Sequence, residues 1–295
     1  MTDARSTILV LSDTHLGRGR GGALSVQALR PLWQSCDRLV LNGDAVEIQD
    51  PRHWAGAARA LMQLREWTER DGVDLVVLSG NHDPHVSDRR HLLEAGGSIL
   101  ITHGDALHPA VAPWSHAAPQ MQAMHERLSA EHGDGLCLDT VLQIARRASS
   151  VEWDAAHVSQ RHSSLLDMAC RPWAAMKVLR YWRRFPALAA RFAARFAPES
   201  RFVITGHSHR QGIWPVGERT VINTGSFGFP GRPRGVIIDE RGLRVHDIVR
   251  RHGRYEMLAN ARWSVEESFQ IPQPLAFPSA ANTRPGSARP SREAI

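Results

Sequence analysis

Short aliphatic runs that stop at polar residues recur along the chain. Each run has three or four residues and ends at Ser, Asn or Thr, with Gly, Asp or His close behind. Such runs are typical of buried parallel strands. Ligands collect beyond the carboxyl ends of strands in open α/β sheets, so we expect the polar tips to lie together. The runs cover residues 8–11, 39–41, 75–78, 99–101 and 202–204.

Helical spacing separates the predicted strands. Residues 54–70 place Trp54, Leu61, Leu64 and Trp67 at intervals that share one helix face. Strands alternating with helices predict a layered α/β fold. After residue 210 the runs 220–226, 235–239 and 243–248 read as short strands with turns between them, and we expect these to form a second sheet packed on the first.

Two segments depart from this pattern. Residues 106–200 lack strand-like runs and are helical by composition, so we interpret them as an insertion beside the site. Residues 271–295 are rich in Pro, Ser, Ala, Asn and Arg, which predicts a disordered tail. We therefore expect one domain over residues 1–270, with a helical cap at about 106–200.

Composition adds limits on partners and location. The chain has 295 residues, 42% of them hydrophobic, and a formal net charge of +6, which suits an anionic partner. No apolar run is long enough to span a bilayer, and no signal-like stretch precedes residue 8. We therefore expect a cytoplasmic protein. The three scattered cysteines have no metal-site spacing and are interpreted as reduced thiols.

The polar tips supply the ligands that a pair of metal ions needs. Sixteen histidines is a high count, and several lie in these tips. Two cations about 3.5–4 Å apart require a shared anion, and Asp44, alone at the second tip, is the natural bridge. Imidazole, carboxylate and amide donors suit divalent first-row metals. The candidate ligands are Asp13, His15, Asp44, Asn81, His103, His207 and His209.

The same tips resemble the five signature blocks of the calcineurin-like metallophosphoesterases, in the family's order. The blocks are Ser12-Asp13-Thr14-His15-Leu16, Gly43-Asp44-x-x-Glu47, Gly80-Asn81-His82-Asp83, Thr102-His103-Gly104-Asp105 and Gly206-His207-Ser208-His209. The resemblance spans residue 8 to about 240, apart from the insertion. It implies a four-layer α-β-β-α sandwich and a hydrolase that cleaves phosphate esters or pyrophosphates with two divalent ions.

The resemblance also implies a role for each residue. One metal takes Asp13, His15, Asp44 and His209, and the other takes Asp44, Asn81, His103 and His207. A hydroxide bridging the metals attacks phosphorus in line. His82 stabilises the transition state or protonates the leaving oxygen. Asp83 either orients His82 or only caps its own turn. Manganese is the favoured metal, with iron or zinc as alternatives. Glu47 is either a site residue or a partner within its own loop.

The first two blocks are similar to those of the UDP-2,3-diacylglucosamine pyrophosphatases. Those enzymes carry a helical insertion between the fourth and fifth blocks that holds acyl chains, and this chain has an insertion at the same place. At position 82 it has histidine where those enzymes usually have arginine. A nucleotide-linked or lipid-linked phosphate is therefore the expected substrate, with Arg18 and Arg210 as candidate substrate contacts.

The second half of the insertion is basic and aromatic. Residues 171–201, with both terminal arginines counted, contain eight Lys or Arg and one acid, and Pro186 is expected to divide the segment into two helices. A basic amphipathic helix with aromatics is typical of an anionic membrane surface, which would place the protein peripherally on the inner membrane face. A packed helix with a solvated basic face is the alternative. Nucleic-acid binding is less favoured.

Other functions remain open from the sequence. A nuclease or phosphodiesterase of this fold would act on nucleotides or nucleic acid, but no further nucleic-acid-binding segment is visible. A protein-phosphatase-like activity is a further alternative. A non-catalytic metal-binding scaffold would be expected to lose ligands or His82, and here every position is filled. The residues favour an enzyme.

Overall fold

Two β-sheets form the centre of the molecule. The computed structural model describes residues 6–159, 172–228 and 231–271. The first sheet has the order β11-β10-β9-β1-β2-β3, with β12 beside β10. Its strands are β1 (Ile8–Leu11), β2 (Arg38–Asn42), β3 (Asp74–Leu78), β9 (Arg234–Asp239), β10 (Gly242–Arg251), β11 (Arg254–Met257) and β12 (Trp263–Glu266). The second sheet runs in the order β4 (His91–Glu94), β5 (Ile99–Thr102), β6 (Phe202–Thr205), β8 (Arg219–Asn223) and β7 (Gly212–Val216).

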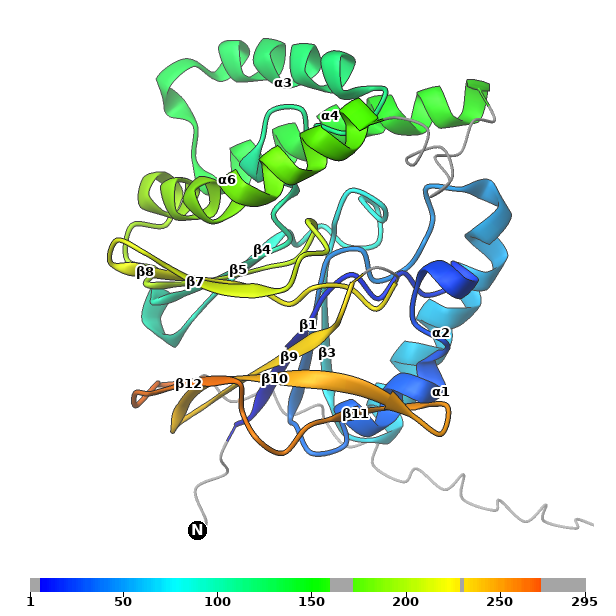
Figure 1. Ribbon diagram of the computed structural model, residues 1–295, viewed down its shortest axis with the longest axis vertical. Helices are drawn as coiled ribbons and strands as arrows, with labels where there is room; N and C mark the ends of the chain where they lie inside the picture. The colour runs from blue at the N-terminus through cyan, green and yellow to red at the C-terminus, as the bar shows by residue number, and fades with distance from the viewer. Residues whose placement is uncertain (1–5, 160–171, 229–230, 272–295) are drawn as a thin grey trace, which may run out of the picture.

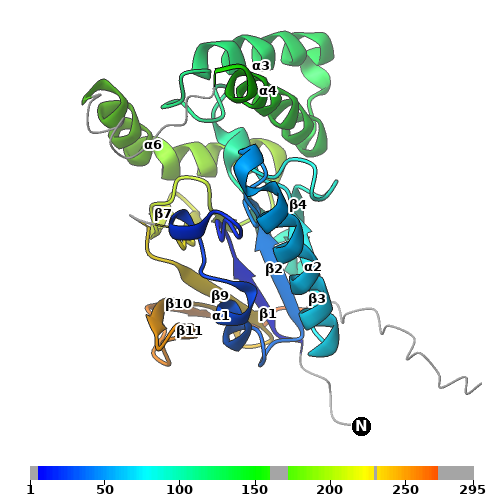
Figure 2. The same ribbon diagram turned by 90° about the vertical axis from the view of Figure 1, so that its right-hand side faces the viewer.

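Helices cover the outer faces of both sheets (Figures 1 and 2). Helices α1 (Val26–Leu29) and α2 (Trp54–Arg70) pack on the first sheet, while α4 (Leu138–Ser159) and α6 (Pro172–Phe196) pack on the second. Helix α3 (Ala118–His132) lies against α4. The 3₁₀ turns are η1 (Gly19–Gly21), η2 (Arg30–Leu32), η3 (Pro51–His53), η4 (Ala95–Gly97), η5 (Asp105–Leu107) and η6 (Gly133–Gly135). The expected α-β-β-α sandwich with a helical segment between β5 and β6 is confirmed.

Alternation along the strands builds the layers. In β1, Ile8 and Val10 belong to the core between the two sheets, which Ile204 of the second sheet also enters. Leu9 and Leu11 point the other way, into the core beneath α1 and α2. Both faces of β1 are buried, so its sequence is a continuous aliphatic run and does not alternate between apolar and polar residues.

The predicted strands are confirmed, but they divide between the two sheets. β1, β2 and β3 are parallel neighbours in the first sheet, whereas β5 and β6 are parallel neighbours in the second. The expectation that strands after residue 210 form a separate sheet is wrong for β9 and β10. β9 pairs antiparallel with β1 and extends the first sheet. The polar tips still meet, because Asn42 Nδ2 donates to the carbonyl oxygens of Thr102 (3.0 Å) and Ile204 (3.3 Å).

Helix α6 continues through Pro186, so the predicted division into two helices is wrong. Proline has no N–H, which leaves the carbonyl four residues earlier, that of Trp182, without its helical partner. Arg210 Nη1 donates to this oxygen at 3.1 Å. After Pro186 the helix buries Phe192 in the core against the second sheet and exposes Arg191 and Arg195 to solvent.

Some sequence predictions lie beyond what the structure describes. The expected disordered tail, 271–295, falls outside the described residues except for Ile271. The division into a domain over 1–270 and a cap at about 106–200 stays a prediction. Among the helices of the described residues, none combines the length and apolar character needed to cross a membrane.

Candidate metal centre

The predicted ligands occupy strained backbone positions at the strand tips. Asp13, His15, Asp44, His207 and His209 all have positive φ angles, between 42° and 64°. Non-glycine residues rarely adopt this conformation, and such residues cluster at functional sites. These five are most of the non-glycine residues with positive φ in the described part of the chain. The strain turns their side chains inward from loops that leave different strands.

One group of ligands gathers around Asp13. His209 Nε2 lies 3.1 Å from Asp13 Oδ1, and His15 Nε2 lies 3.2 Å from His209 Nε2. His15 Nε2 is also 3.8 Å from Asp44 Oδ2. Donor atoms of these four residues all lie within 4.8 Å of one another, which is close enough to bind one cation.

A second group shares Asp44. His103 Nε2 lies 3.3 Å from Asp44 Oδ2, and His207 Nδ1 lies 2.9 Å from Asn81 Oδ1. The rings of His103 and His207 are 5.2 Å apart. Asp44 therefore stands between the two groups. The structure brings together all seven ligands expected from the sequence.

In His103 and His207, one ring nitrogen donates a hydrogen bond to a backbone carbonyl outside the site, and this bond orients the other ring nitrogen toward the metal site. His103 Nδ1 donates to the carbonyl of Asn42 at 3.0 Å, and His207 Nε2 donates to the carbonyl of Val111 at 3.0 Å. His103 Nε2 is then a buried nitrogen, 3.3 Å from Asp44 Oδ2, with no hydrogen-bond partner among the described residues. This arrangement is usual for metal-bound histidine. The donor set fits two divalent metal ions.

The backbone also leaves room at the centre. A Cβ added at Gly80 would collide with the carboxylate of Asp44, and one at Gly206 would collide with that of Asp13. Neither residue has a positive φ, so steric space alone requires glycine here.

His82 lies at the rim of the centre and is held by Glu47. Glu47 Oε1 is 3.0 Å from His82 Nδ1, and its Oε2 is 3.4 Å from His15 Nδ1. Glu47 is buried, whereas His82 is partly exposed. One carboxylate thus contacts both a predicted metal ligand and the predicted acid.

The family model for calcineurin-like phosphoesterase matches residues 6–211. The chain belongs to this family. The match covers both groups of ligands and His82, and it implies a metal-dependent hydrolase of phosphate esters. A comparison with curated proteins finds no significant match.

Several solved structures resemble this calcineurin-like phosphoesterase at low identity. A predicted phosphoesterase from Streptococcus pneumoniae TIGR4 is 19% identical over 88% of this chain and 99% of its own, with a TM-score of 0.36. A dimetal phosphatase from Danio rerio is 13% identical over 85% and 98%, with a TM-score of 0.42. Vacuolar protein sorting 29 from Cryptosporidium parvum is 12% identical over 90% and 100%, with a TM-score of 0.41. These TM-scores are too low to bear on function.

Of the two roles expected for Asp83, the structure supports the turn cap. Its carboxylate accepts hydrogen bonds from the backbone N–H groups of Gly80 (2.7 Å), Asp44 (3.1 Å) and Ala45 (2.7 Å), and these bonds turn it away from His82. Asp83 ties the loop after β3 to the loop after β2, as side-chain caps do in tight turns. The role of Glu47 was open from the sequence. Its position three residues after Asp44 was the sequence feature that indicated a residue of the site.

The charges of this phosphoesterase site are strongly coupled. Burial alone would raise the pKa of Asp44, but positive charge on His103 and His82 outweighs it and holds the pKa well below its usual range. Burial lowers the pKa of His103, and the Asp44 carboxylate more than reverses this, to about 10. Burial and His103 together lower the pKa of His207 to about 4. An anionic Asp44 between the groups is what a shared metal ligand requires.

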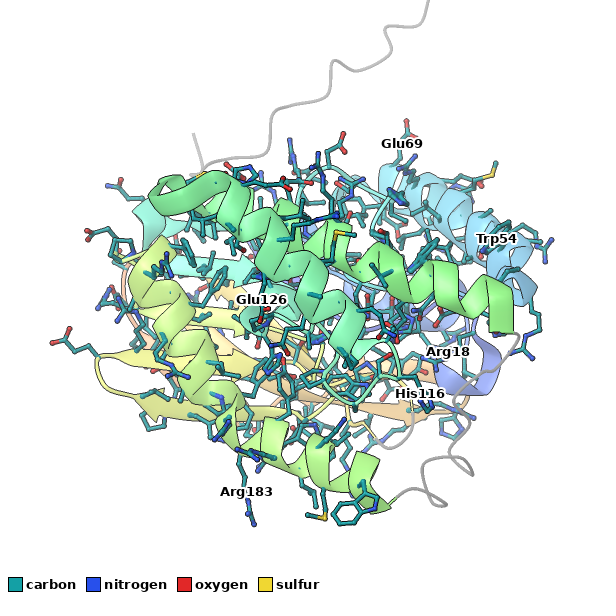
Figure 3. The ribbon with its side chains drawn as sticks, turned by 90° about the horizontal axis from the view of Figure 1, so that it is seen from above. Arg18, Trp54, Glu69, His116, Glu126 and Arg183 are labelled. Atoms are coloured by element: carbon teal, nitrogen blue, oxygen red, sulfur yellow. The ribbon has the colours of Figure 1, made fainter. Side chains whose placement is uncertain are left out.

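The two predicted substrate contacts differ in their surroundings. Arg18 Nη1 lies 3.4 Å from Glu47 Oε2 and its side chain is 36% exposed, beside the site (Figure 3). Arg210 is turned toward α6, where it bonds the Trp182 carbonyl and stacks near the rings of Trp182 and Trp214. Substrate binding by either arginine stays a prediction.

A buried ion pair that the sequence did not reveal supports the loop of His103. Arg90 Nη2 donates to Asp105 Oδ2, and both side chains are almost fully buried. Replacing Arg90 with methionine should destabilise the fold by about 3–5 kcal/mol, because it leaves a buried carboxylate without its partner. Urea denaturation measures the loss. The exposed neighbour Arg89→Met is the control, and an equal loss in both variants would contradict the role of the pair.

Proposed function

We propose that the protein hydrolyses a phosphoester or pyrophosphate bond in a nucleotide-linked or lipid-linked substrate, such as UDP-2,3-diacylglucosamine. The convergence of seven metal-ligand side chains, with His82 at their rim, carries this proposal. Asp13, His15, Asp44 and His209 would hold one divalent ion. Asp44, Asn81, His103 and His207 would hold the other. Manganese is our first choice, with iron or zinc as alternatives.

Two such cations, when bound, offset the negative charge of the phosphoryl group and make a water molecule a better nucleophile near neutral pH. The protein residues hold the metal ligands in place and supply a proton to the leaving oxygen. Burial lowers the pKa of His82, but the carboxylates of Glu47 and Asp44 outweigh it and raise the pKa to about 9. Glu47 accepts from Nδ1, which leaves Nε2 of the imidazolium to protonate the leaving oxygen.

An exposed face of α6 supports the choice of an anionic amphiphile. Trp173, Met176 and Leu179 are 74%, 58% and 54% exposed. Lys177, Arg180, Arg183 and Arg184 lie among them and line a groove of about 660 Å³. All of these except Arg183 also line a second groove of about 670 Å³. None of these four cations forms an ion pair with a described residue. In Figure 3 Arg183 points away from the body of the molecule.

Such a face would suit a substrate with both acyl and phosphate groups. It would equally suit an anionic membrane surface, so we place the protein in the cytoplasm with peripheral contact to the inner membrane face.

The substrate proposal can be tested with a double variant. Arg180→Gln/Arg184→Gln should raise KM for UDP-2,3-diacylglucosamine about tenfold, which corresponds to about 1.4 kcal/mol of lost binding. The KM for bis(4-nitrophenyl) phosphate should not change, because that substrate is too small to reach α6. The matched control is Arg59→Gln/Arg65→Gln, which removes two exposed arginines from α2.

Equal changes on both substrates would contradict a role for α6 in substrate choice. The manganese-loaded protein should also be assayed on cyclic nucleotides, phosphoproteins and single-stranded DNA. Faster turnover of single-stranded DNA than of the lipid-linked nucleotide would overturn the proposal in favour of a nuclease.

A further inference from the structure

The helical segment between β5 and β6 reaches the metal centre through three hydrogen bonds. Trp153 Nε1 of α4 donates to the carbonyl of Asn81 at 3.1 Å. The carbonyl of Val111 accepts from His207 Nε2 at 3.0 Å. Trp182 Nε1 of α6 donates to the carbonyl of Ser208 at 2.8 Å. Each bond ends on a predicted ligand or on the residue beside one.

The Val111 contact depends on an unusual backbone. Val111 is fully buried with a φ of 53°, although a β-branched residue rarely adopts this conformation. Its strained backbone holds the carbonyl that accepts from His207, and the ring of Trp114 packs 5.5 Å from the same imidazole. An outer hydrogen bond of this kind fixes both the tautomer and the orientation of a ligating histidine.

Arg210 and Pro186 help to fix the position of Trp182. Pro186 frees the Trp182 carbonyl, and Arg210 donates to it while its guanidinium lies 6.0 Å from the Trp182 ring. The indole and the loop 206–210 therefore hold each other through two hydrogen bonds that run in opposite directions. Tryptophan has a single donor and a rigid ring, so its position fixes that of the acceptor.

Two of these bonds, those of Trp153 and Val111, fall on one half of the centre. The Ser208 carbonyl that Trp182 contacts lies between His207 of that half and His209 of the other. Asn81 and His207 belong to the group that shares Asp44 with His103. The other group takes its neighbours from the loops after β1, β2 and β6. Glu47 lies beside His15, and Asp13 accepts from the backbone N–H of His207 at 3.1 Å.

We propose that Val111 and Trp153 are positioning residues that set the affinity of one of the two metal positions, the one formed by Asn81, His103, His207 and Asp44. Trp182 instead holds the loop that carries one ligand of each position. The inserted helices are then part of the metal centre and not only a cover beside it. A substrate that displaced α4 would change that position and leave the Asp13 group unaffected. The proposal rests on the proposed two-metal function.

The test removes the Trp153 indole donor and keeps an aromatic ring in its place. We expect Trp153→Phe to bind one Mn²⁺ with the affinity of the unmodified protein and the second about 10- to 100-fold more weakly, as losses of outer hydrogen bonds do. Isothermal titration gives the two affinities. Electron paramagnetic resonance gives a separate readout, since a coupled Mn²⁺ pair should be replaced by the signal of a single ion at limiting metal.

The control is Trp173→Phe, which changes a 74% exposed tryptophan on α6. Equal weakening of both metal positions, or no weakening of either, would overturn the inference. If Trp153→Phe does not fold, Trp153→Tyr is judged by the same criterion. Failure of the unmodified protein to bind two ions would instead overturn the proposed function, so the two failures can be told apart.

Discussion

An Asp44→Asn variant should lose at least about 1,000-fold in turnover, equivalent to about 4 kcal/mol of transition-state stabilisation. Asp44 is the one carboxylate between the two ligand groups, with Oδ2 lying 3.3 Å from His103 Nε2 and 3.8 Å from His15 Nε2. Asparagine keeps the size of the side chain and removes the charge that two neighbouring cations must share. Calorimetric titration with Mn²⁺ should show fewer than two ions bound per chain.

A surface carboxylate provides the matched control for this variant. Asp139→Asn makes the same chemical change at a side chain that is 82% exposed, and we expect turnover and metal binding to stay unchanged. Chelation should abolish the activity of the unmodified protein, and added Mn²⁺ should restore it. Activity that survives both chelation and Asp44→Asn would refute a two-metal mechanism.

Replacing His82 with glutamine should have the second-largest effect, and the effect should depend on the leaving group. Turnover of a substrate with a poor alkoxide leaving group should fall about 10²- to 10⁴-fold, the range found for general acids. A 4-nitrophenyl ester should lose much less, because its leaving group departs without a proton. Exposed His85, three residues away on the same loop, provides the His85→Gln control. Equal losses on both substrates would exclude proton donation by His82.

The pH profile tests the pairing with Glu47. The pKa of His82 is raised to about 9 despite burial, chiefly by the Glu47 carboxylate, so the acidic form is present at neutral pH and is lost as the pH rises through that value. Activity should therefore decline on the alkaline side. Glu47→Gln removes the charge that raises this pKa, so the alkaline limb of kcat/KM should move to lower pH. A limb that stays in place would show that Glu47 does not act on His82.

Much of the site could be predicted because its ligands lie at fixed offsets from strand ends. The aliphatic run 8–11 places Asp13 and His15 just past its carboxyl end, and the run 202–204 does the same for His207 and His209. These pairs can be predicted without knowing the order of the strands in the sheet, because the short loops after parallel strands lie at the same edge.

The partners of His82 could not be predicted in the same way. Asp83 adjoins His82 in the sequence, yet its carboxylate turns back onto the N–H groups of Asp44 and Ala45. Glu47, 35 residues away, bonds the imidazole instead. The direction of a side chain depends on the loop backbone, and here hydrogen bonds between the loops after β2 and β3 fix the direction of Asp83.

The sequence by itself determined the candidate site: five polar strand tips, seven candidate metal ligands and a histidine beside one of them. Hydrophobic runs and short motifs carry this information because it is local. Only the tertiary structure decided that the tips come from two sheets, that α6 continues through Pro186 and that Trp153 and Trp182 reach the ligand loops. Those contacts join residues far apart in the chain, and packing geometry, which no local pattern encodes, sets them.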